Sequence, residues 1–135
     1  MAPVVNRFLK SGVIETKVCV TAQHREMLDQ VLDVFGITPD YDLDLMKPGQ
    51  ELHTLTGAIL SGLTGVLRNC KPRLVLVHGD TLTCFASALA AYYEQIPVAH
   101  VEAGLRTGNI LSPWPEEAMR KLAAGITELN FAPTE

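Results

Sequence analysis

The sequence has few cysteines, and they follow no pattern that binds a metal or builds a disulfide framework. Its 135 residues contain only Cys19, Cys70 and Cys84, with no CxxC pair and no metal-like spacing to a histidine. An odd number of cysteines without such patterns is typical of reduced thiols in a protein of the cytosol. We therefore expect no metal site, and no other part of the sequence indicates a cofactor.

Basic residues and long apolar runs are also scarce. The formal net charge is −4 and there is no dense basic stripe, which argues against nucleic acid as the main partner. The longest apolar stretch, around residues 84–93, is too short and too interrupted to span a bilayer. The first residues, MAPVVNRFLKSG, lack the charged, apolar and small regions of a signal peptide. We therefore expect a cytoplasmic protein that binds neither nucleic acid nor membrane.

Short apolar runs alternate with amphipathic stretches along the whole chain, which is typical of a parallel α/β sheet. No linker or internal repeat interrupts this alternation. The sequence therefore predicts one doubly wound, Rossmann-like domain that covers residues 1–135. The expected helices are residues 3–10, 26–35, 50–68, 82–95 and 113–124, and the expected strands are residues 15–21, 41–45, 73–78, 98–101 and 129–132.

The order of these elements departs from a complete doubly wound domain, which opens with a strand, whereas this chain opens with a helix. In the common strand order 3-2-1-4-5-6 the opening strand is central. It would lie between the strands expected at residues 15–21 and 73–78. We therefore expect the opening strand to be missing.

Two of the apolar strands run directly into an acid. RLVLVHGD ends at Asp80, and PVAHVEAGLRTG places Glu102 after the next strand. The carboxyl ends of parallel strands meet at the edge of the sheet where ligands bind, so a βαβ unit would bring the two acids to one site. His78 lies two residues before Asp80 and would share its face in extended chain. The alternatives are that Asp80 caps the following helix and that His78 is a structural residue.

A third acid lies in SPWPEEAMRKL, where Ser112 or Pro113 would precede a helix with Glu116 and Glu117 in its first turn. Acids in this position are favoured by the helix dipole, so helix-start chemistry is the alternative to a functional role. Glu102 is harder to dismiss, because a charge at the end of a buried strand needs a partner or a ligand.

Four segments carry a resemblance to a known family: KVCVTAQHREMLDQVL, LVLVHGDTLT, PVAHVEAGLRTGN and SPWPEEAMRKL. In this order and spacing they resemble the non-hydrolysing UDP-N-acetylglucosamine 2-epimerases of bacteria, over essentially all of residues 1–135. The resemblance implies an isomerase that interconverts UDP-N-acetylglucosamine and UDP-N-acetylmannosamine by eliminating UDP and adding it back, and so supplies precursors of cell-surface polysaccharide.

The resemblance also implies the architecture. The family has a GT-B-like arrangement of two similar domains, in which the second supplies much of the binding of uridine and phosphate. This chain then corresponds to an N-terminal domain that is incomplete at both ends, in a protein whose full-length relatives form homodimers. The expected small-molecule partner is UDP-N-acetylglucosamine.

Site residues are implied by position in the matching segments. Asp80 and Glu116 match acid/base residues, and Glu102 matches an acid that contacts the sugar or supports the acid/base chemistry. Asp80 and Glu102, with His78, Arg106 and Thr107, are the implied substrate-binding residues. For Arg106 and Thr107, solvated surface is the alternative. A regulatory site for UDP-N-acetylglucosamine is implied by two residues, Gln23 and His24.

The sequence departs from the family at three positions: Glu26 stands where some members have Gln, Gly49 where some have Arg, and Met119 where the PEEANR pattern has Asn. The last change removes an amide donor close to Glu116. Two further functions remain open, namely a hydrolysing 2-epimerase that releases free N-acetylmannosamine, and an inactive fragment that binds nucleotide sugar or dimerises.

Overall fold

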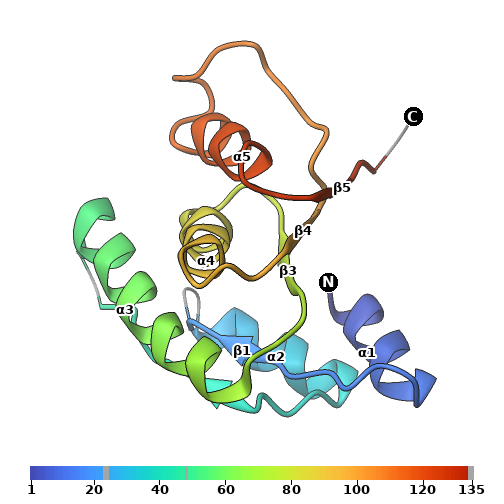
Figure 1. The fold of residues 1–135 in the computed structure, drawn as a ribbon. Coiled ribbons are helices and arrows are strands. Elements are labelled where there is room, and N and C mark those ends of the chain that lie inside the picture. Colours follow the sequence, from blue (N-terminus) through green and yellow to red (C-terminus); the bar gives the residue numbers. More distant parts are fainter. Residues whose placement is uncertain (23–24, 48, 134–135) are drawn as a thin grey trace. The chain divides into compact units, whose positions relative to one another are not determined.

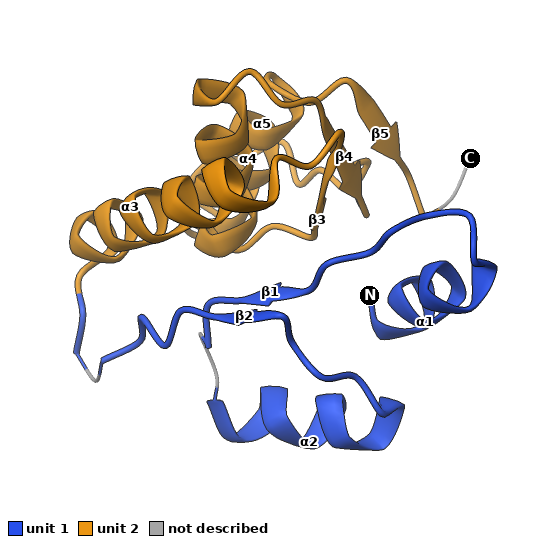
Figure 2. Cartoon of the chain, turned by 60° about the horizontal axis from the view of Figure 1, so that its bottom comes forward, with its two compact units in different colours: residues 1–50 blue, residues 51–135 orange. Residues whose placement is uncertain are grey.

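The computed structural model describes residues 1–22, 25–47 and 49–133, which form two compact units, residues 1–50 and residues 51–135 (Figure 2). Helices and strands alternate along the chain, and every strand pair is parallel. The predicted α/β class with parallel sheets is therefore confirmed. That residues 1–135 act as one domain stays a prediction.

Unit 1 contains a two-stranded sheet and two helices. Strand β1 (Cys19–Val20) pairs with β2 (Tyr41–Asp42), and the helices are α1 (Ala2–Ser11) and α2 (Arg25–Phe35). Both helices lie within one or two residues of the predicted bounds. Helix α1 ends at Gly12, whose φ of 65° is the left-handed conformation that glycine adopts at helix ends.

Both strands of unit 1 are shorter than the predicted residues 15–21 and 41–45. Before β1, the Asp40 carboxylate accepts the backbone N–H of Val18 at 2.8 Å, so a side chain takes the place of a strand partner. After β2, Asp44 adopts a φ of 43° and donates its N–H to the Asp42 side chain. Such a local side-chain turn ends a strand.

Unit 2 contains the predicted βαβ unit and extends it by one strand (Figure 1). Its sheet has the order β3-β4-β5, with Val75 opposite Val98 and Ala99 opposite Leu129. The crossover helices α4 and α5 lie on the same side of this sheet, as right-handed connections between successive strands require. The elements are α3 (Leu52–Cys70), β3 (Val75–His78), α4 (Leu82–Tyr93), β4 (Val98–Val101), α5 (Glu116–Ala124) and β5 (Leu129–Phe131).

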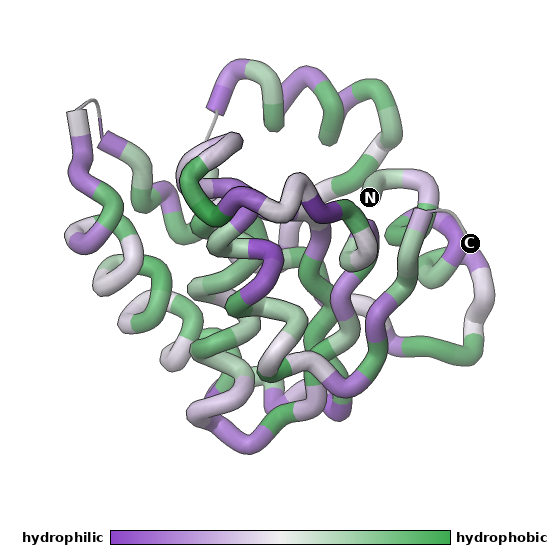
Figure 3. The backbone as a smooth tube through the Cα atoms, turned by 90° about the horizontal axis from the view of Figure 1, so that it is seen from above, coloured by the Kyte–Doolittle hydropathy of each residue, from purple (hydrophilic) through white to green (hydrophobic). Residues whose placement is uncertain are grey.

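The core of unit 2 is built around α4, which packs against α3, α5 and the strands β3 and β4. Helix α3 presents Leu55, Ile59, Leu63 and Leu67 at helical spacing, and all four are buried. The buried residues of α4 are mostly small: Leu82, Cys84, Ala86, Ala88, Ala90 and Ala91. Alanine side chains allow helices and sheet to approach closely, which accounts for the central position of α4. Hydrophobic and hydrophilic stretches alternate along the helices (Figure 3).

Helix α5 begins later than the sequence predicts. Residues 113–115 are turns, and the N-cap residue is Pro115, which makes no side-chain capping bond. The expectation that Ser112 or Pro113 directly precedes the helix is therefore wrong. Helix α4 likewise ends at Tyr93, before the predicted residue 95, because Glu94 and Gln95 turn back to bond Ala90 and Tyr92 carbonyls.

Candidate active site

Asp80 and Glu102 meet at the carboxyl ends of β3 and β4, where both contact one guanidinium group. Nη2 of Arg120, on α5, lies 2.6 Å from Oδ2 of Asp80 and 3.6 Å from Oε1 of Glu102. Because a single nitrogen atom reaches both carboxylates, the two acids share one site. This edge of a parallel sheet is where α/β proteins bind ligands.

His78 joins the same cluster through Glu102. Its Nε2 lies 3.1 Å from Oε2 of Glu102. Burial lowers the pKa of His78 below its usual value, while the charge of Glu102 acts in the opposite direction. Among the described residues, Glu102 is thus the carboxylate that faces the His78 ring. Sequence reasoning placed His78 beside Asp80, but β3 ends at His78 and the backbone turns at Gly79, with a φ of 77°.

Glu102 itself has an unusual backbone conformation, because its φ is 64°. A residue other than glycine in this left-handed region costs of order 1 kcal/mol or more, and such residues gather at functional sites. The turn directs the Glu102 carboxylate toward His78 and Arg120, which hold one of its oxygens each. The strained backbone thus places an acid at a strand end where two other side chains fix it.

Asp80 does not cap α4, so the capping alternative is wrong. The N-cap residue is Thr81, whose Oγ1 accepts the backbone N–H of Cys84 at 3.2 Å. The Asp80 side chain turns instead to Arg120. Its other oxygen, Oδ1, accepts no hydrogen bond from a described residue.

Behind the acids, His100 supports the turn at Gly79. His100 is completely buried in β4, and its Nε2 lies 2.6 Å from the Gly79 carbonyl oxygen and 3.5 Å from Sγ of Cys84. Burial raises the pKa of Cys84 to about 12, so this thiol stays protonated. Sequence reasoning gave His100 no role, because a histidine inside an apolar run has no distinguishing local pattern.

Arg120 was also missed by sequence reasoning. Its side chain is only 7% exposed, and its Nε is buried without a hydrogen-bond partner among the described residues. Glu116 lies one helical turn before Arg120 on the same face of α5, and it is half-buried. The signal that points to Arg120 is electrostatic, because two converging acids need a nearby cation.

Arg106 and Thr107 are engaged by their own loop. Arg106 donates through Nη1 to the carbonyls of Ala103 and Leu105, each at 2.7 Å, and the Thr107 hydroxyl lies 2.6 Å from the Ser112 carbonyl. Among the described residues, neither has a hydrogen bond or ion pair to Asp80 or Glu102. Their assignment to substrate binding stays a prediction.

Glu117 anchors this loop from the first turn of α5. Its side chain is 1% exposed and accepts the backbone N–H groups of Thr107, at 3.1 Å, and Gly108, at 3.3 Å. The hydrogen bond from Thr107, with support from Lys121 at 3.4 Å, holds the pKa of Glu117 below its usual value. The two neighbouring glutamates therefore differ, because Glu117 holds backbone whereas Glu116 lies on the Arg120 face.

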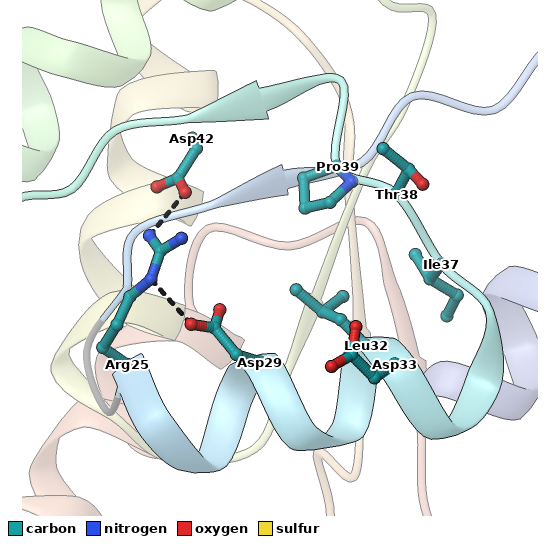
Figure 4. A pocket seen from close by; sticks show the side chains of 8 residues that line it. All are labelled: Arg25, Asp29, Leu32, Asp33, Ile37, Thr38, Pro39 and Asp42. Atoms are coloured by element: carbon teal, nitrogen blue, oxygen red, sulfur yellow. Dashed lines mark hydrogen bonds and ion pairs between the residues drawn. The ribbon is translucent and has the colours of Figure 1, made fainter.

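Unit 1 has an open depression of about 470 Å³ beside α2 (Figure 4). Arg25 lies at one end and pairs there with Asp29, at 3.0 Å, and with Asp42. Its lining residues are Arg25, Asp29, Leu32, Asp33, Ile37, Thr38, Pro39 and Asp42. The predicted regulatory residues Gln23 and His24 lie outside the described residues.

No group of three or more His, Cys, Asp or Glu side chains is arranged to hold a metal ion within residues 1–22, 25–47 and 49–133. No helix in that part of the chain is long and apolar enough to cross a membrane.

The sequence profile of UDP-N-acetylglucosamine 2-epimerase matches residues 7–135. The chain belongs to this family. A solved structure of the epimerase from Neisseria meningitidis, bound to UDP-GlcNAc, is 59% identical with a TM-score of 0.94, and the match covers 100% of this chain and 37% of that one. The epimerase from Methanocaldococcus jannaschii, in complex with UDP-GlcNAc and UDP, is 35% identical with a TM-score of 0.89, over 98% of this chain and 36% of that one.

Curated relatives give the same result. The UDP-N-acetylglucosamine 2-epimerase of Escherichia coli K12 is 59% identical over 135 residues. The match covers 100% of this chain but only 36% of that relative, so this chain spans about a third of the length of the proteins it resembles. The predicted family and its Rossmann-like, GT-B-like fold class are confirmed, and the matching relatives of this family carry the names of enzymes.

Proposed function

We propose that this chain supplies the acid-bearing part of an enzyme that interconverts UDP-N-acetylglucosamine and UDP-N-acetylmannosamine. The observation that carries the proposal is the pair of carboxylates, Asp80 and Glu102, on one buried guanidinium at the carboxyl edge of a parallel sheet. The solved relatives from N. meningitidis and M. jannaschii bind UDP-GlcNAc, which makes a nucleotide sugar the expected ligand.

The chemistry of the proposal needs two groups that handle protons. A carboxylate removes the proton on C2 of the sugar, the C2–H electrons form a double bond to C1, and the C1–O bond to UDP breaks. Protonation of C2 from the other face and re-addition of UDP then give the epimer. We assign the acid/base roles to Asp80 and Glu116, and contact with the sugar or support of the acid/base residues to Glu102.

Departing UDP carries negative charge, which cations or amide donors must stabilise. Within this chain, His78, Arg106 and Thr107 are the side chains we assign to substrate contact. The remaining donors belong to the two thirds of the relatives' length that this chain does not span. We propose that the longer protein is a cytoplasmic homodimer whose product supplies precursors of cell-surface polysaccharide, with residues 1–135 as its N-terminal Rossmann-like domain and with Gln23 and His24 at a regulatory site.

A chimera tests the proposal. Residues 1–135 replace the matching segment of the N. meningitidis relative, and formation of UDP-N-acetylmannosamine is followed by NMR of the anomeric protons. We expect turnover by the chimera and none by the 135-residue chain alone, because the isolated chain lacks most of the phosphate donors. Release of free N-acetylmannosamine and UDP would assign a hydrolysing reaction instead. A folded chimera that makes neither product would refute the proposal.

A further inference from the structure

Arg120 is a buried cation that the proposed proton transfers do not use. Placing a guanidinium in the interior is costly unless its donors are paired, and removal of one member of a buried pair leaves the other uncompensated. Here the side chain is 7% exposed, Nε has no hydrogen-bond partner among the described residues, and the ion pairs are confined to Nη2. A buried donor left without a partner requires an explanation beyond packing.

We infer that Arg120 is the positioning residue of the acid pair: it fixes the Asp80 and Glu102 carboxylates relative to each other and neutralises one of their two charges. This inference deepens the proposed function and rests on it. Arg120 does not touch the substrate in this assignment, because it acts through the two carboxylates that it holds.

The contacts of the two acids separate their roles. Glu102 has one oxygen near Arg120 and the other on His78, so its position is fixed from both sides. Asp80 has Oδ2 on Arg120 at 2.6 Å, and no described residue donates to Oδ1. An oxygen without a donor is available to exchange a proton, whereas a carboxylate with a positively charged or polar side chain near each oxygen is suited to orient a sugar hydroxyl or amide. Arg120 thereby makes Asp80 the acid/base member of the pair.

The electrostatic consequence is that Arg120 offsets the repulsion between the two acids. Among the described residues, Arg120 is the side chain that forms ion pairs with both Asp80 and Glu102. Without it, the two carboxylates repel each other and lose the contact that fixes their separation.

Two substitutions and one matched control test the inference in the chimera. Arg120→Met keeps the length of the side chain but removes the charge, and Arg120→Lys keeps the charge but loses the planar fork. The control is Arg68→Met, which removes an arginine that pairs with Glu94 at 2.9 and 3.0 Å on the surface of unit 2. Arg68 has no described contact with the acid pair.

We expect Arg120→Met to lower kcat by about 10²-fold, the scale of a misplaced acid or base, with a smaller change in KM. Arg120→Lys should restore part of kcat, because it keeps the charge but loses the planar fork. Arg68→Met should match the parent chimera. Wild-type kcat and KM in a folded Arg120→Met chimera would overturn the inference.

A measurement on the 135-residue chain separates this inference from the proposed function. Urea unfolding of Arg120→Met, Asp80→Asn and the double variant forms a double-mutant cycle. We expect the loss of Arg120 to destabilise the chain less once Asp80 is already Asn. Additive effects would show that Arg120 does not hold Asp80, even if the chimera is active. An inactive chimera with a strongly coupled cycle would reject the proposed reaction while the Arg120–Asp80 pairing stands.

Discussion

Arg25 and Arg120 each pair with more than one carboxylate, but their surroundings differ. In unit 1, Arg25 contacts Asp29 and Asp42 with all three side chains at least about one-third exposed, the arginine at 49%. In unit 2, Arg120 is 7% exposed while Asp80 and Glu102 are 29% and 33% exposed. Solvent screens the charges of the first cluster. In the second cluster the arginine is shielded from solvent, whereas water or a ligand can reach its two acids.

The comparison shows that similar charges can serve different purposes. The exposed cluster joins α2 to β2, and the charge of Arg25 is paired there with Asp29 and Asp42. In the buried cluster, Nε of Arg120 has no hydrogen-bond partner within residues 1–22, 25–47 and 49–133, and Glu102 has a strained backbone. Native structures keep such costs where they serve a function. Five predictions test this contrast and the surroundings of the buried cluster.

The largest effect is expected from Asp80→Asn in the chimera. Turnover should fall by about 10²-fold or more, the usual contribution of a general acid or base, while the fold is kept. The fold should survive because Thr81, not Asp80, caps α4. The matched control is Asp29→Asn in the exposed cluster, which should leave turnover unchanged. Equal losses in the two variants would remove the distinction between the clusters.

The next effect concerns stability. Arg120→Met should lower the free energy of unfolding of the chain by about 2–3 kcal/mol, because it leaves two carboxylates close together without their cation. Arg25→Met should leave the urea midpoint unchanged within error, since the exposed pair is screened. If Arg25→Met proves the more destabilising variant, burial is not what separates the clusters.

Glu116→Gln and Glu117→Gln should separate activity from stability. Glu116→Gln should lower turnover and leave the Tm in place. Glu117→Gln should lower the Tm of the chain by a few degrees at pH 7, because it weakens the acceptor for Thr107 and Gly108. The reverse pattern would exchange the roles of the two glutamates.

The Glu117 effect should also depend on pH. Folding lowers the pKa of Glu117 from its ordinary value of 4.5, so the folded state favours the charged form. The stabilisation is therefore complete above that pH and is lost as the pH falls through the lower folded-state pKa. Thermal melts from pH 7 to pH 3 should show the difference between Glu117→Gln and the parent chain shrinking. A constant difference across this range would contradict the hydrogen-bonded carboxylate.

The smallest effect is expected at Cys84. With a pKa of about 12, only about one thiol in 10⁴ is ionised at pH 8, so iodoacetamide should leave Cys84 almost unmodified in the folded chain. Mass spectrometry after digestion should place the modification at Cys19 and Cys70, which are both half-buried. Rapid labelling of Cys84 would mean that the layer beneath the acids opens to solvent. Labelling of the chain unfolded in guanidinium chloride is the control, and Cys84 should then react.

Much of unit 2 was predictable because its signals are local. The apolar run before His78, the alanine-rich stretch of α4 and the second run before Glu102 each report their own secondary structure. The βαβ unit then follows from the right-handed rule, and with it the shared edge of Asp80 and Glu102. Unit 1 was less predictable, since its strands end where the side chains of Asp40 and Asp42 take over backbone N–H groups.

The family, the parallel α/β class and the position of two acids at one sheet edge are all readable from the sequence, because hydrophobic periodicity and strand-end motifs consist of consecutive residues. Which side chains those acids contact depends on tertiary packing. Arg120 follows Asp80 by 40 residues and reaches it because α5 packs on α4. Glu116 and Glu117 are adjacent in sequence, yet Glu116 lies one turn before Arg120 on the same face of α5 whereas Glu117 is buried against the Thr107 loop. Such pairings depend on how elements pack, and no local pattern of residues encodes that geometry.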